Sequence, residues 1–121
     1  MAKRVHDDVL DGAFNVLNDG TTITVCSQEP TTRTEAITTY KLADDTLAGG
    51  DFTIANGDTS GRKCTIAQKT NVPIDTSGTA THVAICDGTR LLYVTTCTSQ
   101  ALTAGGTVTI PAWDVEIADP T

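Results

Sequence analysis

The tetrapeptide Asp-Thr-Ser-Gly occurs twice in the chain, at 58–61 and at 75–78, and raises the question of acid–base catalysis. Aspartic proteases use two aspartates that share a proton, on loops that contain Asp-Thr-Gly or Asp-Ser-Gly. Here the glycine comes one residue late, and the two copies are separated by a single strand pair instead of lying on two lobes. Because Asp, Ser and Gly are also the residues of tight turns, we expect two turns here and no catalytic dyad.

A metal centre is the second kind of chemistry to consider. His6 and His82 are the only imidazoles, and neither has another histidine at a ligand spacing such as i+2 or i+4. A site could be assembled from His82, Cys86 and an aspartate, but no Cys-x-x-Cys pair supports zinc. We therefore expect no metal, no cofactor and no catalytic residue, and hence a protein that is not an enzyme.

The four cysteines each close or lie inside a short strand-like run, where a free thiol behaves as a small apolar group. The N-terminal MAKRVHDD lacks the apolar stretch of a signal peptide, which predicts synthesis in a reducing cytoplasm. Free, buried thiols are therefore expected, and a bridge formed after lysis of the cell is the alternative. The residues concerned are Cys26, Cys64, Cys86 and Cys97.

The elements that would position these groups are mostly strands. About a fifth of the 121 residues is threonine, and aromatic residues make up only 4%. Threonine is stiff at χ1 and suits the half-buried surface of a pleated sheet. From Thr21 onward, short runs of such residues alternate with turn residues, at the spacing of a sandwich or jelly roll. The expected strands cover 21–27, 37–42, 51–56, 62–68, 70–75, 81–87, 90–97, 107–112 and 113–119.

The predicted fold class is thus mainly β: a single antiparallel β-sandwich or jelly-roll-like domain with one short N-terminal α-helix. We expect a helical arm over residues 1–20 and the β-sandwich over 21–121. Pro73 should place its segment at an edge, and Asp87-Gly88-Thr89 should turn a hairpin. In the last strand, Trp113, Val115 and Ile117 alternate with acidic residues, which predicts that all three face the core.

The helix is expected over residues 5–18, where apolar residues recur on one face. This face either covers its own sheet or contacts another subunit. The 28–36 loop around Glu29 and Pro30 is the other candidate contact. The candidate subunit-contact residues are accordingly Val9, Leu10, Phe14, Leu17, Glu29 and Pro30.

The formal net charge of −7 disfavours binding to phosphate backbones or anionic lipid by bulk attraction. No apolar run approaches the length needed to span a bilayer. We therefore expect no nucleic-acid partner and no membrane partner.

Two segments, 2–17 (AKRVHDDVLDGAFNVL) and 81–121 (THVAICDGTRLLYVTTC through to IADPT), resemble small structural proteins from the late gene clusters of tailed bacteriophages. This resemblance covers about half of the chain and includes no chemical motif. It implies a virion protein, and the size is typical of capsid decoration (cement) proteins. Such a protein would bind the major capsid protein on the head surface as a homo-oligomer and stabilise the shell.

Two alternatives remain open at the level of sequence. A tail, head-fibre or receptor-binding component, partnered by tail or fibre proteins, would also suit a Thr-rich β domain with Asp-Gly and Gly-Gly turns. A small hydrolase or a carbohydrate-binding module is the third class, and the latter would need an exposed aromatic ring such as Trp113.

Overall fold

The structure is a computed structural model that describes residues 6–118, and it is mainly β, as predicted. One α-helix, α1 (Asp7–Leu17), precedes all the strands, and two short helical turns, η1 (Glu35–Thr39) and η2 (Gly49–Asp51), lie between them. Residues 1–5 of the predicted arm and the end of the last predicted strand lie outside the described residues. The strands are β1 (Thr22–Cys26), β2 (Lys41–Thr46), β3 (Phe52–Asn56), β4 (Arg62–Ile66), β5 (Lys69–Pro73), β6 (Gly78–Cys86), β7 (Leu91–Leu102), β8 (Thr107–Ile110) and β9 (Trp113–Ile117).

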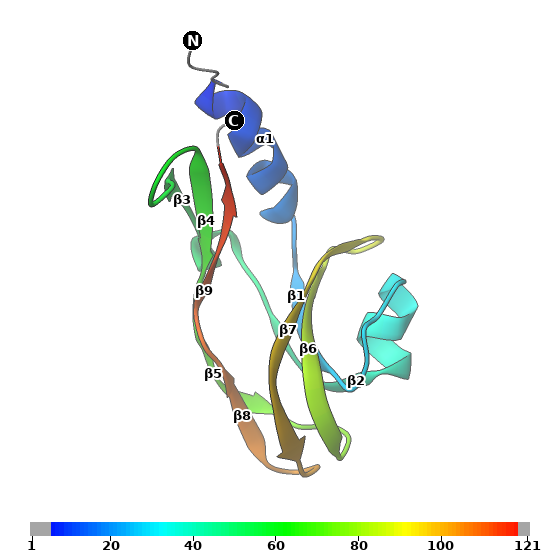
Figure 1. Cartoon of the computed structure of the whole chain (residues 1–121). Coiled ribbons are helices and arrows are strands. Elements are labelled where there is room, and N and C mark those ends of the chain that lie inside the picture. Colours follow the sequence, from blue (N-terminus) through cyan, green and yellow to red (C-terminus); the bar gives the residue numbers. More distant parts are fainter. Residues whose placement is uncertain (1–5, 119–121) are drawn as a thin grey trace.

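The strands form two layers in which every pairing is antiparallel (Figure 1). The first layer is a four-stranded sheet in the order β2-β1-β6-β7. The second layer consists of the sheet β3-β4-β9 and the pair β5-β8. Because β4 leads directly into β5 and β8 leads directly into β9, these two small sheets follow one another along the same side of the molecule.

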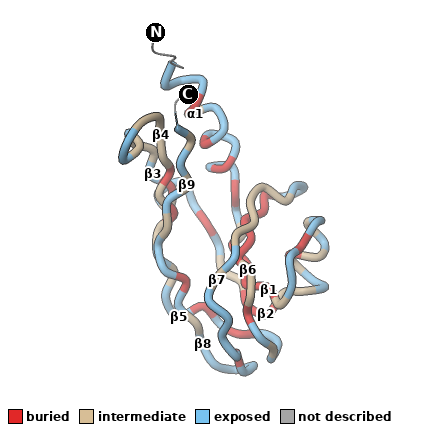
Figure 2. Tube along the Cα trace, in the orientation of Figure 1, coloured by how far each residue is buried: buried red, intermediate tan, exposed pale blue. Residues whose placement is uncertain are grey.

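The core fills the space between the two layers (Figure 2). In β1, Ile23 and Val25 are buried in this core, while Thr24 and Cys26 lie on the other face of the strand and are buried as well. That second face is covered by η1, since the Cys26 thiol donates to the Ala36 carbonyl (3.5 Å). Both faces of the central strand are therefore enclosed, although only one of them meets the main core.

The helix begins and ends as its sequence indicates. The Nδ1 atom of His6 accepts a hydrogen bond from the Asp8 N–H (3.1 Å), and Asp7 and Asp8 occupy the first turn, where carboxylates favour the positive end of the helix dipole. At the other end, the Asn18 N–H donates to the Phe14 carbonyl. Phe14 and Leu17 belong to the main core, so α1 packs as part of the sandwich.

The prediction of a strand over residues 37–42 was wrong for its first part. Residues 35–39 form the π-helical turn η1, and β2 starts only at Lys41 and continues to Thr46, beyond the predicted end at residue 42. The side chain of Glu35 accepts from the N–H and the hydroxyl of Thr31 (2.9 and 2.8 Å), and Thr32 accepts from the Glu35 N–H. These local bonds stabilise a helical turn and override the β propensity of Ile37, Thr38 and Thr39.

Candidate protein-interaction surface

The helix α1 carries two apolar stripes, and only one of them faces the sandwich. Leu10, Phe14 and Leu17 are 7%, 1% and 6% exposed, because they pack into the protein's own core. Of the four helix residues predicted to contact another subunit, Val9 alone is exposed. The predicted contact face therefore covers the protein's own sheets at these three positions.

The second stripe consists of Val9, Ala13 and Val16, spaced i, i+4 and i+7 on the helix surface. Ala13 is exposed, and Val9 and Val16 are the only exposed large hydrophobic side chains found within residues 6–118, at 68% and 43%. We call these three residues the α1 stripe. Val16 was not among the predicted contacts, although its i+7 spacing from Val9 could have indicated it.

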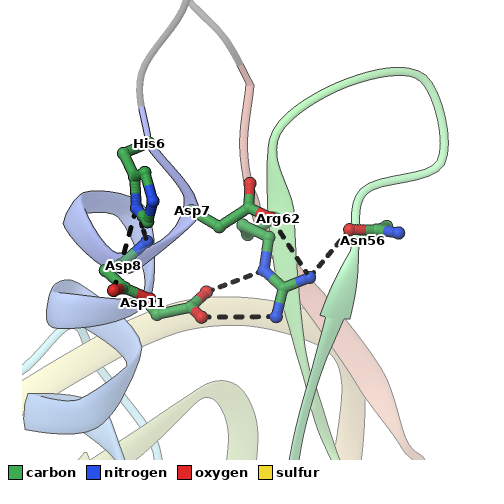
Figure 3. Close-up of polar contacts among 6 residues, drawn as sticks. All are labelled: His6, Asp7, Asp8, Asp11, Asn56 and Arg62. Carbon is green, nitrogen blue, oxygen red and sulfur yellow. Dashed lines mark hydrogen bonds and ion pairs between the residues drawn. The ribbon is translucent and has the colours of Figure 1, made fainter.

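Arg62 of β4 holds α1 in place (Figure 3). Its guanidinium donates to both carboxylate oxygens of Asp11, from Nε at 2.8 Å and from Nη2 at 3.2 Å, and to the side-chain oxygen of Asn56 at 2.7 Å. Asp7 lies 4.0 Å from Nη1. The hydrogen bond with Asp11 and the neighbouring carboxylates raise the pKa of Arg62 above its ordinary value. The two hydrogen bonds from Arg62 to Asp11 fix the rotation of α1 about its own axis, and therefore the direction in which the α1 stripe faces.

A shallow apolar hollow of about 190 Å³ lies beside the α1 stripe. It is formed by residues from both ends of the chain: Ala13 and Val16 from α1, Leu92 and Tyr93 from β7, and Val115 and Ile117 from β9 among them. Segments that are far apart in sequence therefore line the same hollow, and α1 and the end of β9 lie at the same end of the molecule (Figure 1).

The second predicted contact, the loop around Glu29 and Pro30, is only partly accessible. Glu29 is exposed, but Pro30 is buried. Further along the same connection, the Arg33 Nε donates to the backbone carbonyl of Asp87 (2.8 Å) and ties it to the β6–β7 turn. The loop therefore offers Glu29 to a partner and keeps Pro30 inside.

The residues considered for chemistry are dispersed. Asp58 pairs with Lys63 (2.8 Å) and Asp75 pairs with Lys41 (3.2 Å). The two aspartates of the Asp-Thr-Ser-Gly segments therefore lie in different loops and have different lysine partners. The Nδ1 atom of His82 bonds the Thr81 hydroxyl (2.8 Å). Within the described part of the chain, no three His, Cys, Asp or Glu side chains gather closely enough to hold a metal ion.

The cysteines are free thiols in the structure. Cys26, Cys64 and Cys86 are buried and Cys97 is half-buried. Burial raises the pKa of all four thiols, which keeps them protonated near neutral pH. Trp113, Val115 and Ile117 pack against the core while Asp114 and Glu116 are exposed, so the predicted alternation of β9 is confirmed.

All lysine and arginine side chains within residues 6–118 already have a partner. Five form ion pairs with carboxylates, and Arg33 bonds a backbone carbonyl. The surplus negative charge of the chain is therefore left on its surface without intramolecular compensation.

The β6–β7 turn provides a prediction for acid stability. The Asp87 carboxylate accepts from the Thr89 N–H (2.7 Å) and from the N–H and Nε of Arg90. The Thr89 bond, followed by those of Arg90, lowers the pKa of Asp87 to about 2. The aspartates of an unfolded chain have a pKa of about 3.9. The Asp87 carboxylate therefore adds fully to the free energy of unfolding above that pH, and its stabilising effect is lost as the pH falls toward about 2.

We expect Asp87→Asn to lower the urea midpoint at pH 7 and pH 5. The difference from the wild type should shrink when both are measured at successively lower pH between about 4 and 2, since protonation then removes the same charge from the wild-type protein. A difference that stays constant over that range would show that the carboxylate charge is not what stabilises the turn.

None of the described helices is long and apolar enough to cross a membrane. Comparison of the chain with models of protein families, with curated proteins and with solved structures found no match.

Proposed function

We propose that this chain is a structural protein of a tailed-bacteriophage virion, a decoration protein that binds the major capsid protein on the head surface. In this role the protein acts by adhesion and catalyses no reaction. The proposal starts from the phage resemblance of segments 2–17 and 81–121. The observation that carries it further is that α1, β7 and β9, all from those two segments, meet around one apolar hollow.

The α1 stripe is the surface that we assign to the capsid contact. Val9 and Val16 are large apolar side chains that the protein's own fold leaves exposed, and Arg62 keeps them facing outward through its bonds to Asp11. Many copies on a symmetric shell act together, so a modest contact per copy is sufficient to stabilise the shell.

The test mixes the full-length protein with capsid shells of the encoding phage that lack it, followed by co-sedimentation and cryo-electron microscopy. We expect saturable binding to shells, with Val9→Asp and Val16→Asp each weakening it about tenfold or more, because a carboxylate would be buried without a partner. Gln68→Asp adds the same charge at an exposed position in the β4–β5 connection and should bind as the wild type does.

Circular dichroism of each variant establishes that α1 is still folded. Equal binding by Val9→Asp, Val16→Asp and wild type would refute the assigned surface. Density for this chain in the tail or baseplate, with none on the head, would refute the decoration role and favour the tail or fibre alternative.

A further inference from the structure

The segment 91–113 is uncharged: it contains no Asp, Glu, Lys, Arg or His, although the chain has 15 acidic and 8 basic residues. It includes the whole of β7 and β8 and the first residue of β9. Each of these strands is at an edge, in the orders β2-β1-β6-β7, β5-β8 and β3-β4-β9. We call the surface formed by residues 91–113 the open side.

Two apolar hollows lie along the open side, of about 180 and 310 Å³. Both are bordered by Cys97 and Thr98 of β7 and by Pro111, which shows that β7 lies opposite the β8–β9 connection. No charged residue lines either hollow. The side chains of Cys97, Val108 and Trp113 are only partly buried there, so the core is incompletely covered at this side.

Trp113 borders the larger hollow. Its Nε1 atom is buried and meets no hydrogen-bond acceptor among the described residues. An indole N–H can only donate, and a buried donor without an acceptor is costly. Because Nε1 is itself out of reach of solvent, the part of Trp113 that lines the larger hollow is its apolar ring surface.

The other sheet edges carry features that oppose pairing with another chain. β2 carries Lys41, Asp44 and Asp45, and β5 carries Lys69 and Pro73. β3 is uncharged but only five residues long. β7 is twelve residues long and is interrupted only by register shifts opposite Ala80–His82 and Ile85–Cys86.

We propose that two copies of this chain associate through their open sides, with the β7 edge of one copy against the β7 edge of the other. Each copy has a net charge of −7, so contact through most other surfaces would bring carboxylates together. The open side carries no charged side chain, so two acidic copies can meet there without bringing like charges together, and its apolar residues Cys97, Val108 and Trp113 are only partly buried. Carboxylates elsewhere on the two copies are screened beyond about 8 Å at physiological ionic strength.

This inference deepens the proposed function by naming the contact between copies, and it rests on that function only for its purpose. The open side and the α1 stripe share no residue, although Leu92 and Tyr93 at the start of β7 border the hollow beside the α1 stripe. Substitutions at Thr96 and Thr98, which do not line that hollow, therefore test self-association separately from capsid binding.

The test uses the full-length protein in sedimentation equilibrium over a wide concentration range. We expect the mass to rise from that of one 12.6 kDa chain to twice that value. Trp113 is the only tryptophan, and its emission should shift to the blue over the same range as its hollow is covered.

Thr96→Lys and Thr98→Lys place a cation on exposed positions of β7 and should raise the dissociation constant about tenfold or more. Thr53→Lys makes the same change at an exposed position of the edge strand β3 and should leave the dissociation constant unchanged. Urea midpoints of the three variants, measured below the dissociation constant, show whether the fold is retained.

A chain that stays monomeric at all concentrations, or an equal effect of Thr53→Lys, overturns the inference. The inference is also overturned if the wild-type chain is a monomer and the Thr96→Lys variant no longer binds shells. The open side would then be the surface that contacts the capsid protein. A dimer that fails to bind shells leaves the inference intact and refutes the proposed function.

Discussion

Phe14→Ala is expected to lower the free energy of unfolding by about 3–5 kcal/mol, the largest loss from any single truncation in α1. Phe14 is 1% exposed and lies in the main core together with Leu17 and the strands of both layers. Removing its ring leaves a cavity beneath the helix, which cannot close because Arg62 holds α1 through Asp11. A small domain has about 5–15 kcal/mol of stability in total, so the loss is a large part of it.

Urea unfolding followed by circular dichroism measures this effect. Val9→Ala on the exposed stripe of the same helix is the matched control, and it should change stability by less than about 0.5 kcal/mol. A cost below about 1 kcal/mol for Phe14→Ala would mean that α1 does not dock on the sandwich in solution.

Gly61→Ala should be the most disruptive change in the loops. Gly61 has a φ of +70°, and a Cβ atom built on it would lie 1.9 Å from the carbonyl oxygen of Ile117 and 2.9 Å from the Cα of Ala118. Both atoms belong to backbone, so relief requires the end of β9 to move away from β4. We expect a loss of about 2–4 kcal/mol from the left-handed conformation and the forced shift together.

Gly12→Ala provides the opposite result with the same chemical change. Gly12 lies inside α1, and a Cβ atom there would meet nothing within 4 Å. Alanine should therefore stabilise the protein by roughly 0.5–1 kcal/mol through helix propensity. Thermal unfolding of both variants tests the pair. If Gly61→Ala leaves the unfolding midpoint unchanged, the close approach of Gly61 to β9 is not present in solution.

Local patterns in the sequence were sufficient for much of the fold. The period of Leu10, Phe14 and Leu17 predicted the helix, and the alternation of Trp113, Val115 and Ile117 predicted the inward face of β9. The hairpin at Asp87 follows from residues that bond to one another within three positions. Each of these features depends on neighbouring residues, whose geometry is set by backbone periodicity.

The failures concern features that depend on competition between local and distant contacts. Residues 37–39 are of types that favour strands, yet they continue a helical turn that is stabilised by hydrogen bonds of Glu35 with Thr31 and Thr32. Pro30 was expected to be available to a partner and is buried. Propensity is a weak determinant where side chains can bond the backbone or fill a space beside a sheet.

By itself, the sequence determined the mainly β class, the antiparallel character, the position of the helix and the uncharged stretch between Arg90 and Asp114. Tertiary structure alone decided that this stretch forms one side of the sandwich and that Val9 and Val16 remain exposed. It also decided that Arg62 forms hydrogen bonds with Asp11, which lies 51 residues earlier in the chain. The reason is physical: periodicity assigns a residue to a face, whereas the packing of distant elements decides which faces are covered.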